Sequence, residues 1–142
     1  MPSPLSILYS YYNQPLMLAL QLAEWNQYPP EVQVILVDDG SPAPAEPVMR
    51  KLSSTALLEH LRLYRIMVNI PWNREEARNI GAQEATTEWI VQLDLDHLLP
   101  AVYVPALLAC VPDPTRWYRF PRFRRGQADG TRLKDALPRQ ET

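Results

Sequence analysis

The sequence predicts an α/β domain in which helices cover both faces of a mostly parallel sheet. Segments typical of strands and helices alternate from Leu5 to about Leu93, and parallel strands joined by right-handed crossovers satisfy such an alternation best. The run from Val32 to Val37 is almost continuously apolar, which is typical of a strand that is covered on both faces. The chain has 142 residues, of which 46% are hydrophobic and 21% charged, so it fits one ordinary domain with one core.

The first part of the chain predicts a strand, a helix and a second strand. Leu5 to Tyr11 is short, aromatic and apolar enough for a buried strand. Asn13 and Pro15 then supply an N-cap and an early proline for a helix that should run to about Tyr28. Leucines lie on two faces of this helix, so we expect it to pack against a broad surface. Two prolines end it before the strand at Val32 to Val37.

The remaining elements follow the same alternation and then end in a basic segment. Two acids stand in the first turn of the most regular helical pattern, where the helix macrodipole favours negative charge. In chain order we expect a loop at Gly40 to Pro47, a weak helix at Val48 to Leu58, a strand at Leu61 to Val68, a helix at Asn73 to Thr86, a strand at Glu88 to Leu93, a short helix at Val102 to Cys110, and a last strand at Trp117 to Phe123 with Pro121 at an edge.

Composition excludes several classes of protein. No apolar run reaches the roughly 18 residues that a membrane span requires, and the apolar content is too high for a disordered chain. The 15 prolines against 4 glycines weigh against a glycine-rich phosphate loop. No basic segment precedes an apolar stretch at the N-terminus, so we expect a cytoplasmic protein. The single Cys110 stands in an apolar run and is expected to be buried.

The net charge of -2 conceals two regions of opposite sign. Residues 1–115 carry 6 Lys/Arg against 13 Asp/Glu, whereas residues 116–142 carry 8 against 3. We therefore expect an α/β domain over residues 1–115 and a basic C-terminal strand and tail over residues 116–142. A basic end could meet nucleic acid, an acidic membrane surface or a diphosphate. Its alternating aromatic and arginine residues also fit an amphipathic edge strand, which we favour over a nucleic-acid surface.

Ligands of open α/β sheets bind at the carboxyl ends of the strands, and polar residues gather at two such ends here. The second strand runs into Asp38-Asp39-Gly40-Ser41, and because adjacent side chains on an extended backbone point opposite ways, we expect one of the two acids to face a ligand. For this tetrapeptide taken alone we favour the alternative, an Asx-turn with two solvated acids.

The fourth strand ends in Asp94-Leu95-Asp96-His97, whose two acids stand at positions i and i+2 and so share one side. Two adjacent carboxylates repel each other, and a hard cation such as Mg²⁺ or Mn²⁺ removes that penalty. His97 is either a further ligand or a histidine hydrogen-bonded beside an acidic turn. Arg74 and Arg78 share one helix face, where one of them could contact a ligand or pair with Glu75 or Glu84.

Four motifs stand in one order along the chain: Tyr11-Tyr12-Asn13, Asp38-Asp39-Gly40-Ser41, Ala77-Arg78-Asn79-Ile80-Gly81 and Asp94-Leu95-Asp96. Together they resemble the family 2 glycosyltransferases, and the resemblance covers about Leu5 to Leu99. The resemblance implies a Rossmann-like αβα sandwich of the nucleotide-diphospho-sugar transferase type, truncated relative to the family. It also implies a nucleotide-sugar as partner, with a UDP-sugar expected, and Mn²⁺ or Mg²⁺ as cofactor.

The resemblance further implies a role for each matching residue. Asp39, with Asp38 beside it, would bind the base of the nucleotide, Ser10 and Tyr11 would form the wall against the uracil ring, Arg78 would lie near the nucleotide, Asp94 would be the acid on the ribose or metal side, Asp96 would be the direct metal ligand, and His97 is a further candidate ligand.

No general base can be assigned from the sequence. Members of the family usually continue into an acceptor-binding half that supplies an acidic base, whereas 46 residues follow Asp96 here. Asp113, Asp129, Asp135 and Glu141 remain as candidates, and none stands in a matching motif. Three functions therefore stay open: a metal-dependent glycosyltransferase, a nucleotide-binding module or remnant without turnover, and a phosphatase of the haloacid dehalogenase type. The phosphatase is less favoured, although the segment Leu93 to Leu99 also fits the strand that carries the nucleophile in that family.

Overall fold

The computed structural model describes residues 4–110, 112–120 and 139–141, the last three by their backbone alone. The chain divides into two compact units, Met1–Leu99 and Pro100–Thr142. This division falls before the boundary at residue 115 that the change of charge predicts. Both of the strand ends that are expected to carry ligands, at residues 38–41 and 94–97, lie in the first unit.

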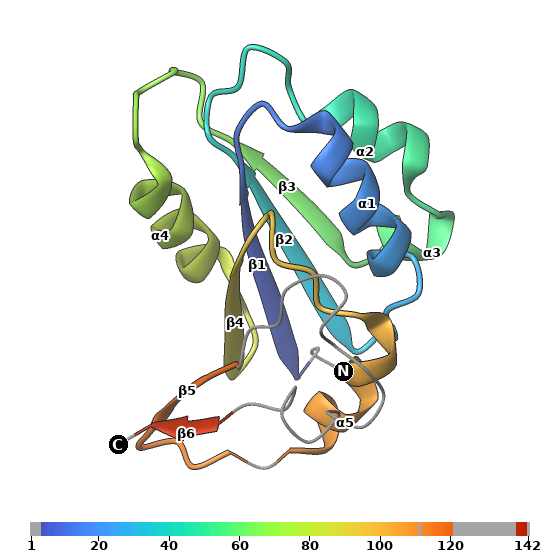
Figure 1. Cartoon of the computed structure of the whole chain (residues 1–142), viewed down its shortest axis with the longest axis vertical. Coiled ribbons are helices and arrows are strands. Elements are labelled where there is room, and N and C mark those ends of the chain that lie inside the picture. Colours follow the sequence, from blue (N-terminus) through green and yellow to red (C-terminus); the bar gives the residue numbers. More distant parts are fainter. Residues whose placement is uncertain (1–3, 111, 121–138, 142) are drawn as a thin grey trace. The chain divides into compact units, whose positions relative to one another are not determined.

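The first unit is built on a four-stranded parallel sheet with the order β3-β2-β1-β4 (Figure 1). At its centre β1 (Leu5–Tyr11) pairs with β2 (Val32–Asp38) on one side and with β4 (Trp89–Asp94) on the other, and β3 (Leu61–Arg65) pairs with β2. β1 and β2 are buried along nearly their whole length. The predicted α/β fold with a parallel sheet is therefore confirmed.

Helices cover both faces of this sheet. α1 (Pro15–Trp25), α2 (Glu46–Leu52) and α3 (Thr55–Leu58) lie on one face, and α4 (Arg74–Glu84) lies on the other (Figure 1). Under α4 a buried cluster includes Leu8, Val37 and Ala77. On the opposite face Trp25 of α1 contacts Tyr9, with ring centroids 4.8 Å apart. Because side chains alternate along a strand, consecutive residues of β1 serve the two cores.

The order of the strands creates a switch point between β1 and β4. The connections from β1 to β2 and from β2 to β3 run over the face that α1 and α2 cover, whereas the return from β3 to β4 runs over the face that α4 covers. The register places Ser10 of β1 directly opposite Asp94 of β4 at this point. In open α/β sheets ligands bind outside the carboxyl ends of the strands at such a switch point.

Three elements of the first unit differ by more than a residue or two from their predicted bounds. α1 ends at Trp25, three residues before the expected Tyr28. The single helix expected at 48–58 is two helices, because Ser54 caps a new one by accepting a hydrogen bond from the N–H of Leu57 at 3.0 Å. β3 ends at Arg65 rather than Val68, since its pairing partner Asp38 is the last residue of β2.

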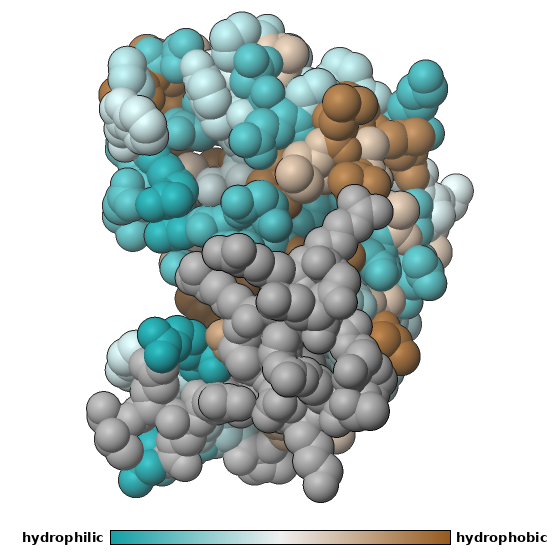
Figure 2. Space-filling view, viewed as in Figure 1, coloured by the Kyte–Doolittle hydropathy of each residue, from teal (hydrophilic) through white to brown (hydrophobic). Residues whose placement is uncertain are grey.

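Only one of the two leucine faces of α1 is covered in the described structure. Leu18 and Leu22 are fully buried, whereas Leu16 and Leu20 are 83% and 63% exposed. Figure 2 shows hydrophobic residues over α1 and hydrophilic ones over α4. The expectation of a broad packing surface for α1 is therefore right for one face of the helix.

In the second unit a 3₁₀ turn (η1, Ala101–Tyr103) leads into α5 (Val104–Ala109), and β5 (Trp117–Arg119) pairs antiparallel with β6 (Arg139–Glu141). The expected strand to Phe123 thus ends earlier, and Pro121 lies outside the described residues. Cys110 is exposed, not buried as predicted, because it lies just past the last turn of α5. Among the described residues, no helix has the length and apolar character to span a membrane.

Candidate functional site

The end of β2 is a tight turn that is organised around a buried carboxylate. Asp38 is fully buried, and its two oxygens accept hydrogen bonds from the backbone N–H groups of Ser41 at 3.0 Å and Ala45 at 2.9 Å. Gly40 has a φ of 67°, and a Cβ at this position would lie 2.3 Å from the carbonyl oxygen of Val68. The turn therefore requires glycine. The predicted Asx-turn is present, but its acids are buried instead of solvated.

Asp39 has different partners from Asp38, as their alternation along the chain predicts. Its carboxylate accepts a hydrogen bond from the side-chain amide of Asn73, just before α4, at 3.4 Å. Only 6% of the residue is exposed. Burial raises the pKa of the Asp39 carboxyl, repulsion from Asp38 and Glu76 adds to the increase, and the bond from Asn73 opposes it. Asp39 is thus a buried acid whose side-chain partner stands at the start of α4.

The end of β1 presents two tyrosines in different environments. Tyr11 is fully buried, and its hydroxyl donates to the carbonyl oxygen of Ala43 at 3.2 Å, so it braces the loop after β2. Burial raises the pKa of the Tyr11 hydroxyl. Tyr12 is 45% exposed and donates to the side-chain oxygen of Asn69 at 3.2 Å. The aromatic ring that is open to a ligand at this strand end therefore belongs to Tyr12.

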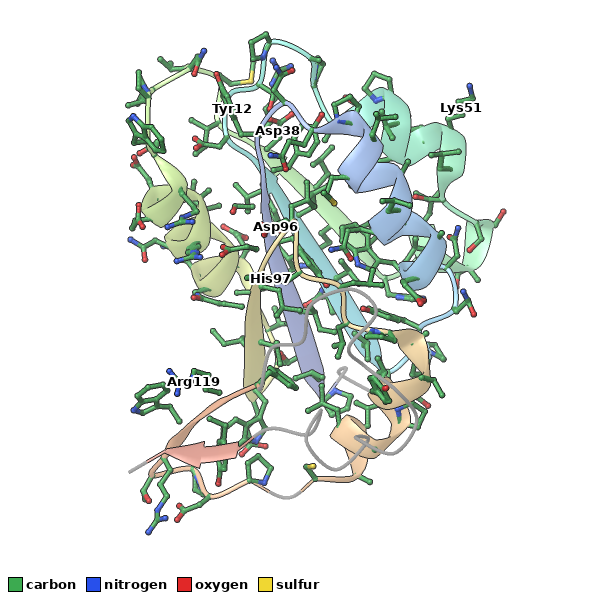
Figure 3. All side chains as sticks on the ribbon, viewed as in Figure 1. Tyr12, Asp38, Lys51, Asp96, His97 and Arg119 are labelled. Carbon is green, nitrogen blue, oxygen red and sulfur yellow. The ribbon has the colours of Figure 1, made fainter. Side chains whose placement is uncertain are left out.

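The end of β4 gathers the predicted metal ligands. The N–H of His97 donates to the carbonyl oxygen of Asp94 at 2.9 Å and turns the chain back on itself. One ligand atom each from Asp94, Asp96 and His97 lie within 4.8 Å of one another, and Figure 3 shows Asp96 and His97 side by side beyond β4. The imidazole nitrogens of His97 lie 3.9 Å from Asp94 Oδ2 and 3.9 Å from Asp96 Oδ1. We call residues 94–99 the β4 turn.

Two arginines of α4 point at the same acid. Arg78 donates a short hydrogen bond to Asp94 Oδ1, and Arg74 Nη1 lies 3.9 Å from this oxygen. Arg74 also lies 3.7 Å from Glu75. The predicted alternative, in which an arginine pairs with a glutamate of the same helix, is therefore observed for Arg74. Because Arg78 occupies Oδ1, the second carboxylate oxygen of Asp94 is the one that faces His97.

The residues of the β4 turn fit a hard divalent cation. Carboxylate oxygens are the ligands that Mg²⁺ and Mn²⁺ prefer in proteins, and these ions usually keep room for waters or phosphates. The side chain of Asp96 is 65% exposed, whereas that of Asp94 is 26% exposed. Asp96 thus offers the more open carboxylate oxygen of the two acids.

Two side chains that hold the β4 turn were not predicted from the sequence. Gln21 of α1 donates from Nε2 to the carbonyl oxygens of Leu95 at 2.7 Å and His97 at 2.8 Å, and the hydroxyl of Tyr28 donates to the carbonyl oxygen of Leu99 at 2.6 Å. Both are buried. A glutamine among leucines on the core side of an apolar helix was the available signal, because a buried amide needs polar partners.

One of the four general-base candidates has a described side chain. Asp113, in the second unit, accepts hydrogen bonds from the backbone N–H and the hydroxyl of Thr115 at 2.9 and 2.7 Å. These bonds lower the pKa of the Asp113 carboxyl, which makes it a weaker base. Asp129, Asp135 and the side chain of Glu141 lie outside the described residues. The base stays unassigned.

An open parallel sheet with acidic side chains at its switch point is the arrangement in which α/β domains bind ligands at the carboxyl ends of their strands. The sequence matches Glycosyl transferase family 2 over residues 6–136, and the chain belongs to this family. The resemblance based on the four motifs is thereby confirmed. Family membership favours sugar transfer over the phosphatase alternative.

Two solved structures are similar in fold to this chain. A mannosyltransferase from Pyrobaculum calidifontis, PcManGT, in complex with GDP-Man and Mn²⁺, has a TM-score of 0.62 and 22% identity, with 76% of this chain and 31% of that chain covered. Residues 1–349 of TarS from S. aureus give a TM-score of 0.54 and 17% identity, with 75% and 33% covered. At such identities the likeness establishes the fold, and the chain spans about a third of these structures. No curated protein matches the sequence.

Proposed function

We propose that this chain is the nucleotide-binding part of a metal-dependent glycosyltransferase that takes its sugar from a nucleoside diphosphate sugar, with a UDP-sugar as the first candidate. The observation that carries the proposal is the cluster of Asp94, Asp96 and His97 at the switch point of the sheet. Family membership supports the reaction class. A structural neighbour that holds GDP-Man and Mn²⁺ supports the ligand class.

The proposed nucleotide site combines the ends of β1, β2 and β4 with the start of α4. Asp39 would bind the base, with Asp38 beneath it holding the turn. Ser10 and Tyr11 would form the wall behind the base, and Tyr12 adds an exposed ring on which a base can stack.

Three further features stay predictions. They are a cytoplasmic location, a division of the chain at residue 115, and contact of the basic C-terminal end with a membrane surface.

The acids would bind the metal ion at the diphosphate, and Arg78 would balance the charge of one of these acids. Mn²⁺ or Mg²⁺, when bound, would stabilise the negative charge that develops on the departing diphosphate. Asp96 and the free oxygen of Asp94 would hold the ion, with His97 beside them. Arg78 neutralises Asp94 and fixes the direction of its carboxylate, so that the repulsion between the two acids is already offset before a ligand binds.

Calorimetry with UDP, and in parallel with GDP, in the presence and absence of Mn²⁺ tests the proposal. Asp96→Ala should abolish the Mn²⁺-dependent part of nucleotide binding and leave the fold intact, since the side chain is exposed. Asp113→Ala, which removes another exposed acid with hydrogen-bond partners in the second unit, is the matched control and should bind as the unaltered chain does. An unchanged affinity in Asp96→Ala would refute the metal role of Asp96.

A donor-hydrolysis assay separates a transferase from a binding module. Release of sugar from the nucleotide-sugar, lost in Asp96→Ala, supports an enzyme. Nucleotide binding without any release of sugar would assign the chain to the second class, a non-catalytic nucleotide-binding module.

A further inference from the structure

We propose that Gln21 and Tyr28 are positioning residues that set the geometry of the β4 turn and thereby its affinity for the metal ion. The inference rests on the proposed function, because it concerns the same site. Neither side chain offers a ligand to the ion. Both act through the backbone that carries Asp94, Asp96 and His97.

Gln21 holds the backbone on both sides of the proposed metal ligand. Its side-chain nitrogen has two hydrogens, and they go to the carbonyl oxygens of Leu95 at 2.7 Å and His97 at 2.8 Å. These two carbonyl groups flank Asp96 in the chain. A single amide therefore fixes the peptide group that precedes Asp96 and the peptide group that follows His97, and Asp96 carries the most exposed carboxylate of the cluster.

Burial of the Gln21 amide costs stability, and packing in the core gives no reason for an amide at this position. Gln21 is 1% exposed, and its neighbours on the inner side of α1, Leu18 and Leu22, are fully buried apolar residues. The oxygen Oε1 of Gln21 has no hydrogen-bond partner within the described part of the chain. A buried acceptor without a partner destabilises the fold, so an apolar residue would serve the core better. The two donated bonds are the contribution that only the amide makes.

Tyr28 holds the far end of the same turn. It is 5% exposed, and its hydroxyl donates to the carbonyl oxygen of Leu99 at 2.6 Å. Burial and the neighbouring Tyr9 raise the pKa of the Tyr28 hydroxyl, so it stays a donor over the accessible pH range. The near end is held by β4, where Asp94 pairs with Ser10 of β1. The β4 turn is thus restrained at its start, middle and end.

This restraint matters because the three described metal-ligand candidates all come from one short stretch of chain. Their ligand atoms lie within 4.8 Å of one another only while the turn keeps its shape. Residues that orient metal ligands without touching the metal typically change metal affinity by about 10- to 100-fold when they are replaced. We expect a change of this size when the donors of Gln21 are removed.

The test compares Gln21→Met with Gln33→Met. Methionine keeps the length of the side chain and removes the donors. Gln33 of β2 is also a buried glutamine, and the hydrogen bond that it accepts from the hydroxyl of Ser6 at 3.1 Å lies outside the β4 turn. The Kd for Mn²⁺ is measured by calorimetry in the presence of UDP. Gln21→Met should raise this Kd by about 10- to 100-fold, and Gln33→Met should leave it unchanged.

Two results would overturn the inference while the proposed function stands. One is a Kd in Gln21→Met equal to that of the unaltered chain, and the other is the same increase in both variants, which would mean a general loss of packing. Should Gln21→Met not fold, Tyr28→Phe decides, because it removes a single hydroxyl. A several-fold increase of the Kd in this variant supports the inference, and an unchanged Kd opposes it.

A measurement without metal separates the inference from the proposed function. The N–H of His97 donates to Asp94 inside the turn, so its hydrogen exchange reports how firmly the turn is held. If the unaltered chain binds no Mn²⁺, the proposed metal role fails. Faster exchange of this amide in Gln21→Met, and not in Gln33→Met, would then still establish the positioning role, whereas equal exchange would refute it.

Discussion

The two acidic strand ends of the sheet use the same residue type in opposite ways. At the end of β2, Asp38 and Asp39 are 0% and 6% exposed, and Asp38 gives both oxygens to backbone N–H groups. At the end of β4, the side chains of Asp94 and Asp96 are 26% and 65% exposed, and their neighbours are arginine and histidine side chains.

This difference separates scaffold from binding site. Backbone N–H groups are fixed partners, and a ligand could replace them only by unfolding the turn. The guanidinium of Arg78 and the imidazole of His97 sit on rotatable side chains, so a metal ion or a phosphate can exchange with them at little cost. The end of β2 therefore stabilises the fold, whereas the acids at the end of β4 remain accessible to a ligand. Asp39 lies between these cases, since a side-chain amide is its partner.

Asp38→Ala should produce the largest loss of stability. It removes two charged hydrogen bonds and leaves two backbone N–H groups without their partner, so we expect the free energy of unfolding to fall by about 3 kcal/mol. Asp96→Ala, at the exposed strand end, should change it by less than about 0.5 kcal/mol. Urea denaturation of both variants measures the contrast, and equal losses would contradict the division into scaffold and binding site.

Gly40→Ala should be the next largest effect. The added Cβ would meet the carbonyl oxygen of Val68 at 2.3 Å, and the residue would be held at positive φ, which together should cost about 2 kcal/mol or more. Gly81→Ala is the matched control, because a Cβ there meets Leu8 at an ordinary 3.6 Å. In α4 this second change should stabilise the protein by up to about 1 kcal/mol. Thermal unfolding of the pair checks both signs.

Asp39→Asn should have a smaller effect that depends on pH. Burial raises the pKa of Asp39 above its usual value of 3.8, so the folded protein holds this proton more tightly than the unfolded chain does. The stability of the unaltered chain should therefore fall as the pH rises from 3.8 through the folded pKa. Asparagine cannot ionise, so the variant should be the more stable one at neutral pH and lose this advantage in acid. Urea denaturation at a series of pH values tests this.

The same variant also tests the role of Asp39 in binding. If Asp39 binds the base, Asp39→Asn should bind UDP more weakly in the absence of metal although it unfolds less readily. An unaltered Kd for UDP would count against the assignment. A variant that is more stable but binds UDP more weakly would indicate that Asp39 serves binding at the expense of stability.

Arg78→Met should change stability least. The Arg78 and Asp94 side chains are 32% and 26% exposed, so their ion pair lies partly in water and should contribute less than about 1 kcal/mol. The difference from the unaltered chain should shrink in 1 M NaCl, where the Debye length is about 3 Å. Asp38→Ala should show no such dependence, because its partners are buried backbone groups. A loss in Arg78→Met that salt does not alter would show that this strand end is more rigid than the exposures indicate.

The sequence alone predicted those features that depend on local spacing. Alternating strands and helices indicated the parallel sheet, and Asp94 and Asp96 two residues apart indicated a pair of acids on one side. The turn after Asp39 followed from Gly40, since this residue type adopts positive φ readily. Errors arose where a neighbour decides a boundary: β3 is shortened because β2 ends, and a serine cap splits the helix at 48–58.

Only the tertiary structure decided which of these acids serve the scaffold and which remain open to a ligand. The strand order placed β4 beside β1 and so made Ser10 the neighbour of Asp94. The contact between Gln21 and Leu95 spans 74 positions of the chain. Periodicity and turn chemistry act over a few residues, whereas such a hydrogen bond exists only after the sheet and α1 have assembled. The sequence therefore indicated which residue types stand at the strand ends, whereas the assembled tertiary structure determines which partners they have.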